Sequence, residues 1–96
     1  MSTGHRPYLD LLPYEAIRRE RLYQTNKWGE HNQTHHYVEW LAILAEEFGE
    51  VATETNAIIW DKKSRDEVWE HLRSELIQVA AVAVAWIQQI DRERKS

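Results

Sequence analysis

Hydrophobic residues recur at intervals of three and four along three stretches of the chain, which is the spacing of one face of an α-helix. The pattern predicts helices at about residues 14–27, 36–59 and 65–92. No stretch alternates apolar and polar residues for long enough to indicate a strand. We therefore expect an all-α fold with about three helices in each chain.

Turn-forming residues separate these helices. Gly29 is a suitable C-terminal stop for the first helix, and Ser64-x-x-Glu67 is a capping-box pattern at the start of the third. Residues 1–14 contain both prolines and are expected to form an N-terminal arm. The predicted organisation is an arm (1–14), one helical domain (15–93) and a short tail (94–96).

Each predicted helix has an apolar face, and the faces differ in width. The first is partial, whereas residues 79–87 near the end of the third helix carry no polar side chain at all. A helix that is apolar all round is enclosed by neighbours, and three helices per chain offer few of them. We therefore expect these neighbours to include another subunit. The faces comprise Tyr14, Ile17, Leu22 and Tyr23; Trp40, Leu41, Leu44, Phe48 and Val51; and Val68, Leu72, Val79, Val82 and Trp86.

Glutamates interrupt two of these faces. Glu47 falls at the margin of the second apolar face, and Ile43 lies between Glu47 and Glu50 on the helical wheel. Glu75 falls in the middle of the third face. A buried carboxylate is costly unless a cation joins it. A divalent metal ion is the cation that could satisfy several carboxylates at once.

The spacing of these acids suits a shared ion. Glu47 and Glu50 are three residues apart and project together, and Glu46 can reach the same space. Glu75 and Gln78 repeat that spacing, so antiparallel packing of the two helices would bring both pairs together. Oxygen ligands of this kind favour Mg²⁺ or Mn²⁺. Two alternatives remain open: the Glu46–Glu50 group could be solvated surface, and Glu75 could pair with an Arg or Lys of the core.

Three sequence blocks in this order resemble the MazG-like branch of the all-α nucleoside triphosphate pyrophosphohydrolases. The blocks are RLYQTNKWGE at 21–30, WLAILAEEFGEV at 40–51 and ELIQVAAVAVAW at 75–86. The resemblance covers about residues 15–90 and is strongest to the small phage-type and bacterial members. The family pattern is E-E-x-x-E on one helix and E-x-x-D on the next, so Gln78 departs from it.

The resemblance implies a helical bundle that is completed as a homodimer or homotetramer. It also implies Mg²⁺-dependent hydrolysis of a nucleoside triphosphate, with dATP or dGTP favoured, to the monophosphate and pyrophosphate. By position, Glu47, Glu50 and Glu75 would be metal ligands, and Glu46 would be a further ligand or would orient the attacking water. Gln78 would be a fourth, uncharged ligand or would contact substrate. A second hypothesis, which Gln78 favours, is a helical oligomerisation or regulatory module that has lost catalysis.

The end of the first predicted helix could contact the substrate. Lys27 is suited to phosphate, Trp28 to stacking on a base, and Gln24 belongs to the same block. Trp28 could equally be a core or interface aromatic. A zinc site at His31 and His35, which are four residues apart, is the less favoured alternative for the loop.

Composition narrows the other classes of function. The net charge of −4 argues against binding to a nucleic-acid polymer or a membrane surface, and the absence of cysteine excludes thiolate metal sites. The N-terminus lacks a secretion signal, and the nine-residue apolar run is far short of the roughly 20 residues that span a bilayer. A cytoplasmic protein is the expectation.

Overall fold

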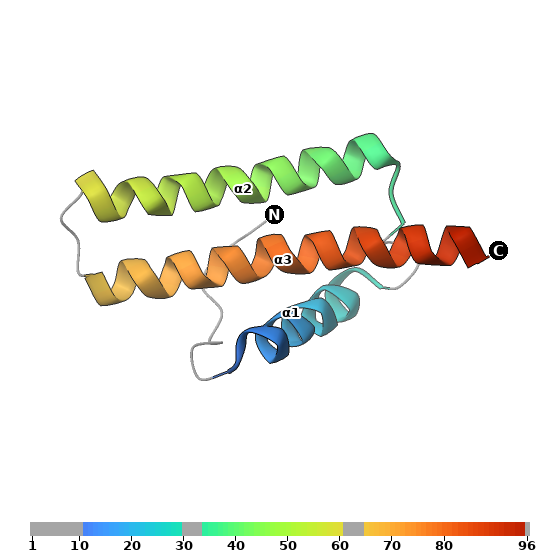
Figure 1. Cartoon of the computed structure of the whole chain (residues 1–96), viewed down its shortest axis with the longest axis horizontal. Helices are drawn as coiled ribbons and strands as arrows, with labels where there is room; N and C mark the ends of the chain where they lie inside the picture. Colours follow the sequence, from blue (N-terminus) through green and yellow to red (C-terminus); the bar gives the residue numbers. More distant parts are fainter. Residues whose placement is uncertain (1–10, 30–33, 61–64, 96) are drawn as a thin grey trace.

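The computed structural model describes residues 11–29, 34–60 and 65–95, and this part of the chain contains three α-helices and no strand (Figure 1). They are α1 (Pro13–Trp28), α2 (Tyr37–Trp60) and α3 (Arg65–Lys95). The all-α prediction is confirmed. Most of the predicted arm and the capping residue Ser64 lie outside the described residues.

The helix ends differ slightly from the predicted ones. Pro13 begins α1 inside the predicted arm, because proline fits the first turn, where its missing N–H costs no hydrogen bond. Gly29 ends α1 as expected, with φ 77° and its N–H donating to Thr25 O at 2.8 Å. At the other end α3 continues through residues 94 and 95 of the predicted tail. Its last turn carries Arg92, Arg94 and Lys95, whose charges complement the C-terminal end of the helix dipole.

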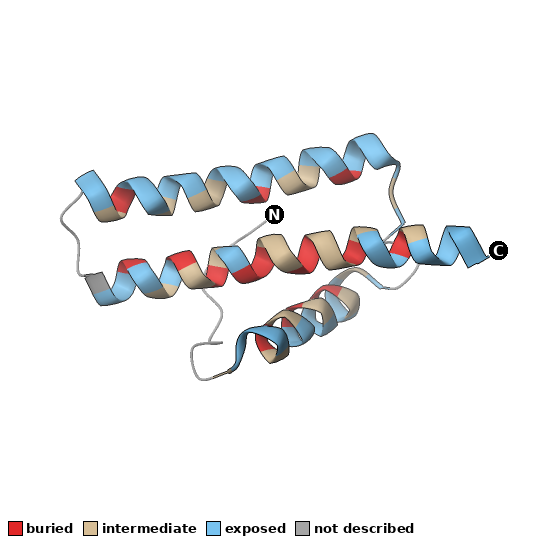
Figure 2. Cartoon of the chain, viewed as in Figure 1, coloured by how far each residue is buried: buried red, intermediate tan, exposed pale blue. Residues whose placement is uncertain are grey.

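The long helix α3 organises the fold. Its 31 residues correspond to about 46 Å of helix, and both other helices pack on it. α2 runs antiparallel alongside α3, and α1 crosses a different side of α3 (Figure 1). Buried positions follow one another along α3, while the buried positions of α2 lie on the side of its ribbon that faces α3 (Figure 2).

An aromatic and amide cluster fixes the pairing of α2 with α3 near the start of α2. Trp40 Nε1 donates to Gln89 Oε1 at 2.7 Å, and the Trp40 ring stacks against Trp86 with centroids 6.4 Å apart. Gln89 also accepts from His35 N at 2.8 Å and donates to His35 O at 2.7 Å. Because these bonds are made by buried groups, they specify one register between the two helices.

The buried face of α1 is not the predicted one. Tyr14 is 88% exposed and Leu22 is 48% exposed, so the apolar face expected on this helix is wrong. The helix instead buries Ala16, Glu20 and Gln24, which are spaced four residues apart. Glu20 and Gln24 are polar, so the pattern of apolar residues in the sequence did not predict their burial.

The predicted apolar face of α2 is only partly buried. Trp40 is buried and Leu44 and Val51 are half-buried, but Leu41 is 59% exposed and Phe48 is 65% exposed. The helix is rotated so that Glu47, rather than Phe48, faces the interior. The central stripe of α3 agrees better with prediction, since Val68, Leu72 and Val82 are buried.

None of the helices in the described part of the chain is both long enough and apolar enough to cross a bilayer.

Replacement of Gln89 by alanine should lower the free energy of unfolding by about 2 kcal/mol, because Trp40 Nε1 and the His35 N–H would lose their acceptor while buried. Urea denaturation measures the change. Gln88→Ala is the matched control, because Gln88 is exposed and accepts hydrogen bonds from Arg21 of α1. This variant should lose less than about 1 kcal/mol of unfolding free energy. Equal losses in both variants would contradict the anchoring role of Gln89.

Candidate metal centre

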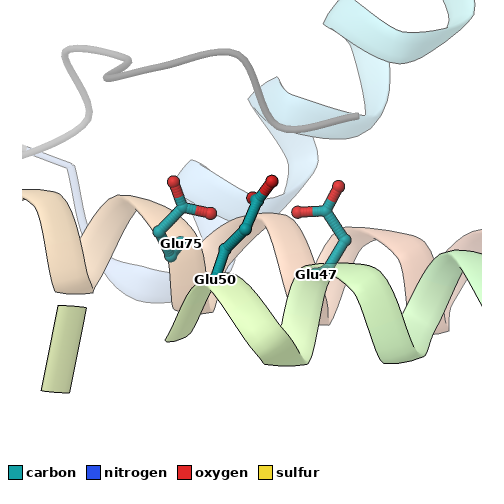
Figure 3. A group of neighbouring side chains, drawn as sticks. All are labelled: Glu47, Glu50 and Glu75. Carbon is teal, nitrogen blue, oxygen red and sulfur yellow. The ribbon is translucent and has the colours of Figure 1, made fainter. Parts of the chain in front are cut away.

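Three carboxylates converge between α2 and α3. One oxygen from each of Glu47, Glu50 and Glu75 lies within 4.8 Å of the other two. Glu47 and Glu50 come from successive turns of α2, Glu75 comes from α3, and all three side chains project in the same direction (Figure 3). This confirms that the two predicted acidic segments meet, and the register of the helices explains why.

The register follows from contacts on either side of the cluster. His71 of α3 faces Glu54 of α2, with Nδ1 and Oε1 4.0 Å apart. One turn further along both antiparallel helices, Glu50 is level with Glu75, and another turn places Glu47 level with Gln78. The two i, i+3 pairs are therefore matched across the interface.

Burial makes this cluster different from an acidic surface patch. Glu47 is only 2% exposed. Its Oε2 atom and that of Glu50 are shielded from solvent and have no hydrogen-bond partner in the described part of the chain. No lysine or arginine of that part forms an ion pair with either residue. A solvated surface is thus excluded for Glu47, and none of the described residues forms an ion pair that would balance its charge.

The electrostatics of the cluster lead to the same conclusion. Burial raises the pKa of Glu47 to about 7, and the negative charges of Glu50, Glu46 and Glu20 contribute to this rise. Glu47 therefore keeps its proton up to near-neutral pH, and a metal ion would have to displace that proton. A cation that replaces this proton would remove both the desolvation cost and the repulsion between neighbouring carboxylates.

The geometry fits a small divalent ion after a minor adjustment. Oxygens bound to one Mg²⁺ are at most about 4.2 Å apart, which is twice the metal–oxygen distance. The present spread of up to 4.8 Å exceeds this by only a few tenths of an ångström. An ion bound by all three would therefore draw these oxygens closer together.

Gln78 and Glu46 differ in how they relate to the cluster. Gln78 is 3% exposed, and its Nε2 donates to Ser74 Oγ at 3.4 Å. Its role as a fourth ligand stays a prediction. Glu46 is exposed and lies outside the group of converging carboxylates. Its predicted catalytic role stays a prediction.

The three residues expected to bind substrate have different surroundings. Gln24 is buried, accepts from Arg21 Nη1 at 2.7 Å and donates to Glu20 Oε2 at 3.3 Å. Lys27 is exposed, with Nζ 5.9 Å from the Tyr23 ring centre and 5.8 Å from that of Trp28. Trp28 is half-buried at the end of α1. Lys27 and Trp28 thus form one cationic and aromatic group, while Gln24 is held inside.

Glu20 is the polar residue near the site that sequence reasoning missed. It is 1% exposed and close enough to Glu47 to raise the pKa of that residue. The signal in the sequence was weak: Glu20 stands four residues from both Ala16 and Gln24, and only the packing of α1 on α3 shows that this line is the buried one.

No described histidine belongs to a group of possible metal ligands. His35 bonds Gln89 and packs edge-on against Trp40, with ring centres 4.8 Å apart. His31 lies outside the described residues. Among the described side chains, the only cluster suited to a metal is the glutamate group.

Comparisons of the chain with protein-family models, with curated proteins and with solved structures found no match. Function is therefore inferred from the residues themselves and from the resemblance of the three sequence blocks.

In EDTA, the free energy of unfolding should fall as the pH rises from about 4.5 to about 7 and level off above that. The folded protein holds the Glu47 proton up to about pH 7, whereas the unfolded chain releases it near 4.5. This difference corresponds to at most about 3 kcal/mol. Urea denaturation between pH 5 and 8 measures it.

Glu47→Gln should flatten this pH dependence and raise stability at pH 8, since a neutral amide replaces the buried charge. Glu67→Gln, at an exposed position in the first turn of α3, is the control and should keep the slope of the wild-type protein. A full slope in Glu47→Gln would show that another group is responsible.

Proposed function

We propose that the chain is a Mg²⁺- or Mn²⁺-dependent pyrophosphohydrolase that converts a nucleoside triphosphate to the monophosphate and pyrophosphate. The observation that supports this most is the convergence of Glu47, Glu50 and Glu75, in which the Oε2 atoms of Glu47 and Glu50 are shielded from solvent and accept no hydrogen bond from the described part of the chain. The choice of purine deoxynucleotides, dATP or dGTP, follows from the resemblance of the sequence blocks.

The donor set fits a hard divalent cation. Glu47, Glu50 and Glu75 would hold it through carboxylate oxygens, and Gln78 would add a neutral amide oxygen. Three protein carboxylates leave coordination positions for phosphate and water. A divalent ion at such a site neutralises phosphate oxygens and lowers the pKa of a bound water.

Residues of α1 would contact the substrate. Lys27 is exposed beside the Trp28 ring, so the pair could engage a phosphate oxygen and a base from the same end of α1. Gln24 would act from inside, where it bonds Glu20 of the same helix, and the charge of Glu20 reaches Glu47. Glu46 would orient the attacking water only if substrate or a second copy of the chain closed over its exposed side.

A second copy of the chain is part of the proposal. Exposed apolar side chains occur on all three helices and are most continuous along α2, where Val38, Leu41 and Phe48 are each more than half exposed. Their spacing of three and seven residues places them on one stripe. A homodimer or homotetramer formed through this stripe would bury it and enlarge a small core.

The purified protein should release pyrophosphate from at least one nucleoside triphosphate when Mg²⁺ or Mn²⁺ is present, and it should lose this activity in EDTA. Glu50→Gln should reduce kcat/KM by at least a hundredfold, because it removes a metal ligand's charge from a half-buried site. A pyrophosphate assay over the eight common ribo- and deoxynucleotides tests this.

Glu67→Gln makes the same chemical change at an exposed position and should keep wild-type activity. Isothermal titration with Mn²⁺ separates loss of the ion from loss of chemistry: Glu50→Gln should bind Mn²⁺ more weakly, and Glu67→Gln should bind it normally. Near-normal turnover by Glu50→Gln would disprove the assignment of ligands.

The alternative of a regulatory or oligomerisation module rests on Gln78, which brings no charge to the fourth ligand position. Gln78→Asp separates the two functions. If the protein binds Mn²⁺ but hydrolyses no nucleotide, and Gln78→Asp creates activity, the scaffold has lost catalysis at this residue. Activity in the wild-type protein excludes the module.

Leu41→Glu and Phe48→Glu should each shift the protein to the monomer, because a charge in the centre of a buried apolar interface is strongly unfavourable. Sedimentation velocity measures the change in mass. The same substitution at Ala52, which is exposed on α2 but apolar over a smaller area, should have less effect. A wild-type protein that is monomeric at all concentrations would refute the oligomer.

A further inference from the structure

A pocket of about 780 Å³ lies between α1 and the C-terminal part of α3, away from the carboxylates. Four of the side chains that line it are basic, Arg18 and Arg21 from α1 and Arg92 and Lys95 from α3, against one acidic residue, Asp91. This concentration of positive charge is unusual in a chain whose net charge is −4. The pocket is therefore suited to an anion.

The guanidinium of Arg21 is hydrogen-bonded by neutral groups and not by a carboxylate. Its guanidinium is half-buried, and the bonds it makes go to neutral amide oxygens: Nη1 donates to Gln24 Oε1 at 2.7 Å, and Nη2 and Nε donate to Gln88 Oε1 at 3.0 and 3.2 Å. Amide oxygens satisfy the donors but bring no negative charge. Burial and the positive charge of Arg92 both lower the pKa of Arg21, and the negative charge of Glu20 offsets this only in part.

The other basic groups are arranged differently. Arg18 is engaged by Glu15 through two bonds of 3.0 Å, so its charge is partly neutralised. Lys95 is exposed in the last turn of α3. An anion in the pocket would thus contact the guanidinium of Arg21, whose orientation is fixed by its hydrogen bonds. Arg92 and Lys95 of α3 line the same pocket. Arginine presents several N–H groups in a planar fork, which matches phosphate oxygens.

The pocket is separate from the glutamate centre. Glu47 is level with Gln78, and Gln88 follows Gln78 by ten positions of α3, which corresponds to about 15 Å. Arg92 and Lys95 are farther still. A triphosphate chain held by the carboxylates does not extend that far, so one phosphate group cannot use both places.

We propose that this pocket is a second anion site, which binds a small phosphate-bearing ligand such as pyrophosphate through Arg21 and Arg92. The site does not depend on the proposed hydrolysis, since it needs neither the glutamates nor a metal. The bonds from Arg21 to Gln24 and from Gln24 to Glu20 connect it to the buried side of α1.

The test is calorimetric titration of the full chain with pyrophosphate in EDTA at low ionic strength, which removes divalent ions from the glutamate centre. The wild-type protein should bind, and Arg92→Gln should weaken binding by roughly tenfold, the loss expected for one charged hydrogen bond. Lys95→Gln should also weaken it and serves if Arg92→Gln is unstable. The Arg21 Nε–H signal in a nitrogen–proton NMR spectrum should shift on addition of pyrophosphate.

Arg19→Gln is the matched control. Arg19 is on α1, pairs with Glu15 at 3.0 Å, and is not among the residues that line the pocket. Absence of binding by the wild-type protein would overturn the site. So would an equal loss in Arg19→Gln, which would indicate attraction to overall charge, or an Arg21 signal that does not move. If pyrophosphate does not bind, the proposal of metal-dependent hydrolysis is unaffected. If no nucleotide is hydrolysed, the proposal of a second anion site is unaffected.

Discussion

The burial of the Glu47 carboxylate beside Glu50 and Glu75, without a basic partner from the described part of the chain, is the constraint on which the rest of the structure depends. An arrangement of this kind opposes folding, because desolvation and repulsion both act against it. The surrounding contacts must therefore hold α2 and α3 together without help from the centre. A bound cation would make the contribution of the carboxylates to the folding free energy favourable, so cation binding and protein stability are linked.

The contacts that hold the hairpin are found away from the carboxylates. Near the start of α2, Trp40, Trp86 and Gln89 lock the register through stacking and buried hydrogen bonds. Farther along, Ala57, Val68 and Leu72 bury apolar surface. The contacts on either side of the acidic centre thus offset its unfavourable electrostatic free energy. Such division between stable anchors and an unfavourable centre is common where a site must stay open to a ligand.

Charges of opposite sign are kept apart along the molecule. The acidic group occupies the middle of the α2–α3 interface, and the basic pocket lies at the C-terminal end of α3 against α1. Direct pairing between the two would have neutralised both. The rigid length of α3 prevents it, and the side chains of Gln24 and Gln88 support Arg21 with neutral oxygens instead of carboxylates. Separation leaves each group able to attract its own ligand.

The sequence by itself determined the helices and the meeting of the acids. Apolar periodicity predicted three helices within a few residues of their ends, and Glu75 stood out because it interrupts the stripe that contains Val82. Tertiary structure decided the rotation of each helix. Residues such as Phe48 and Leu22 are exposed, while Glu20 and Gln24 are buried, because each helix turned toward α3 the face whose shape and register fitted, and hydropathy alone does not encode that fit. The basic pocket also depends on the crossing of α1 over α3, which joins Arg21 and Arg92 from opposite ends of the chain, a proximity that no local pattern could express.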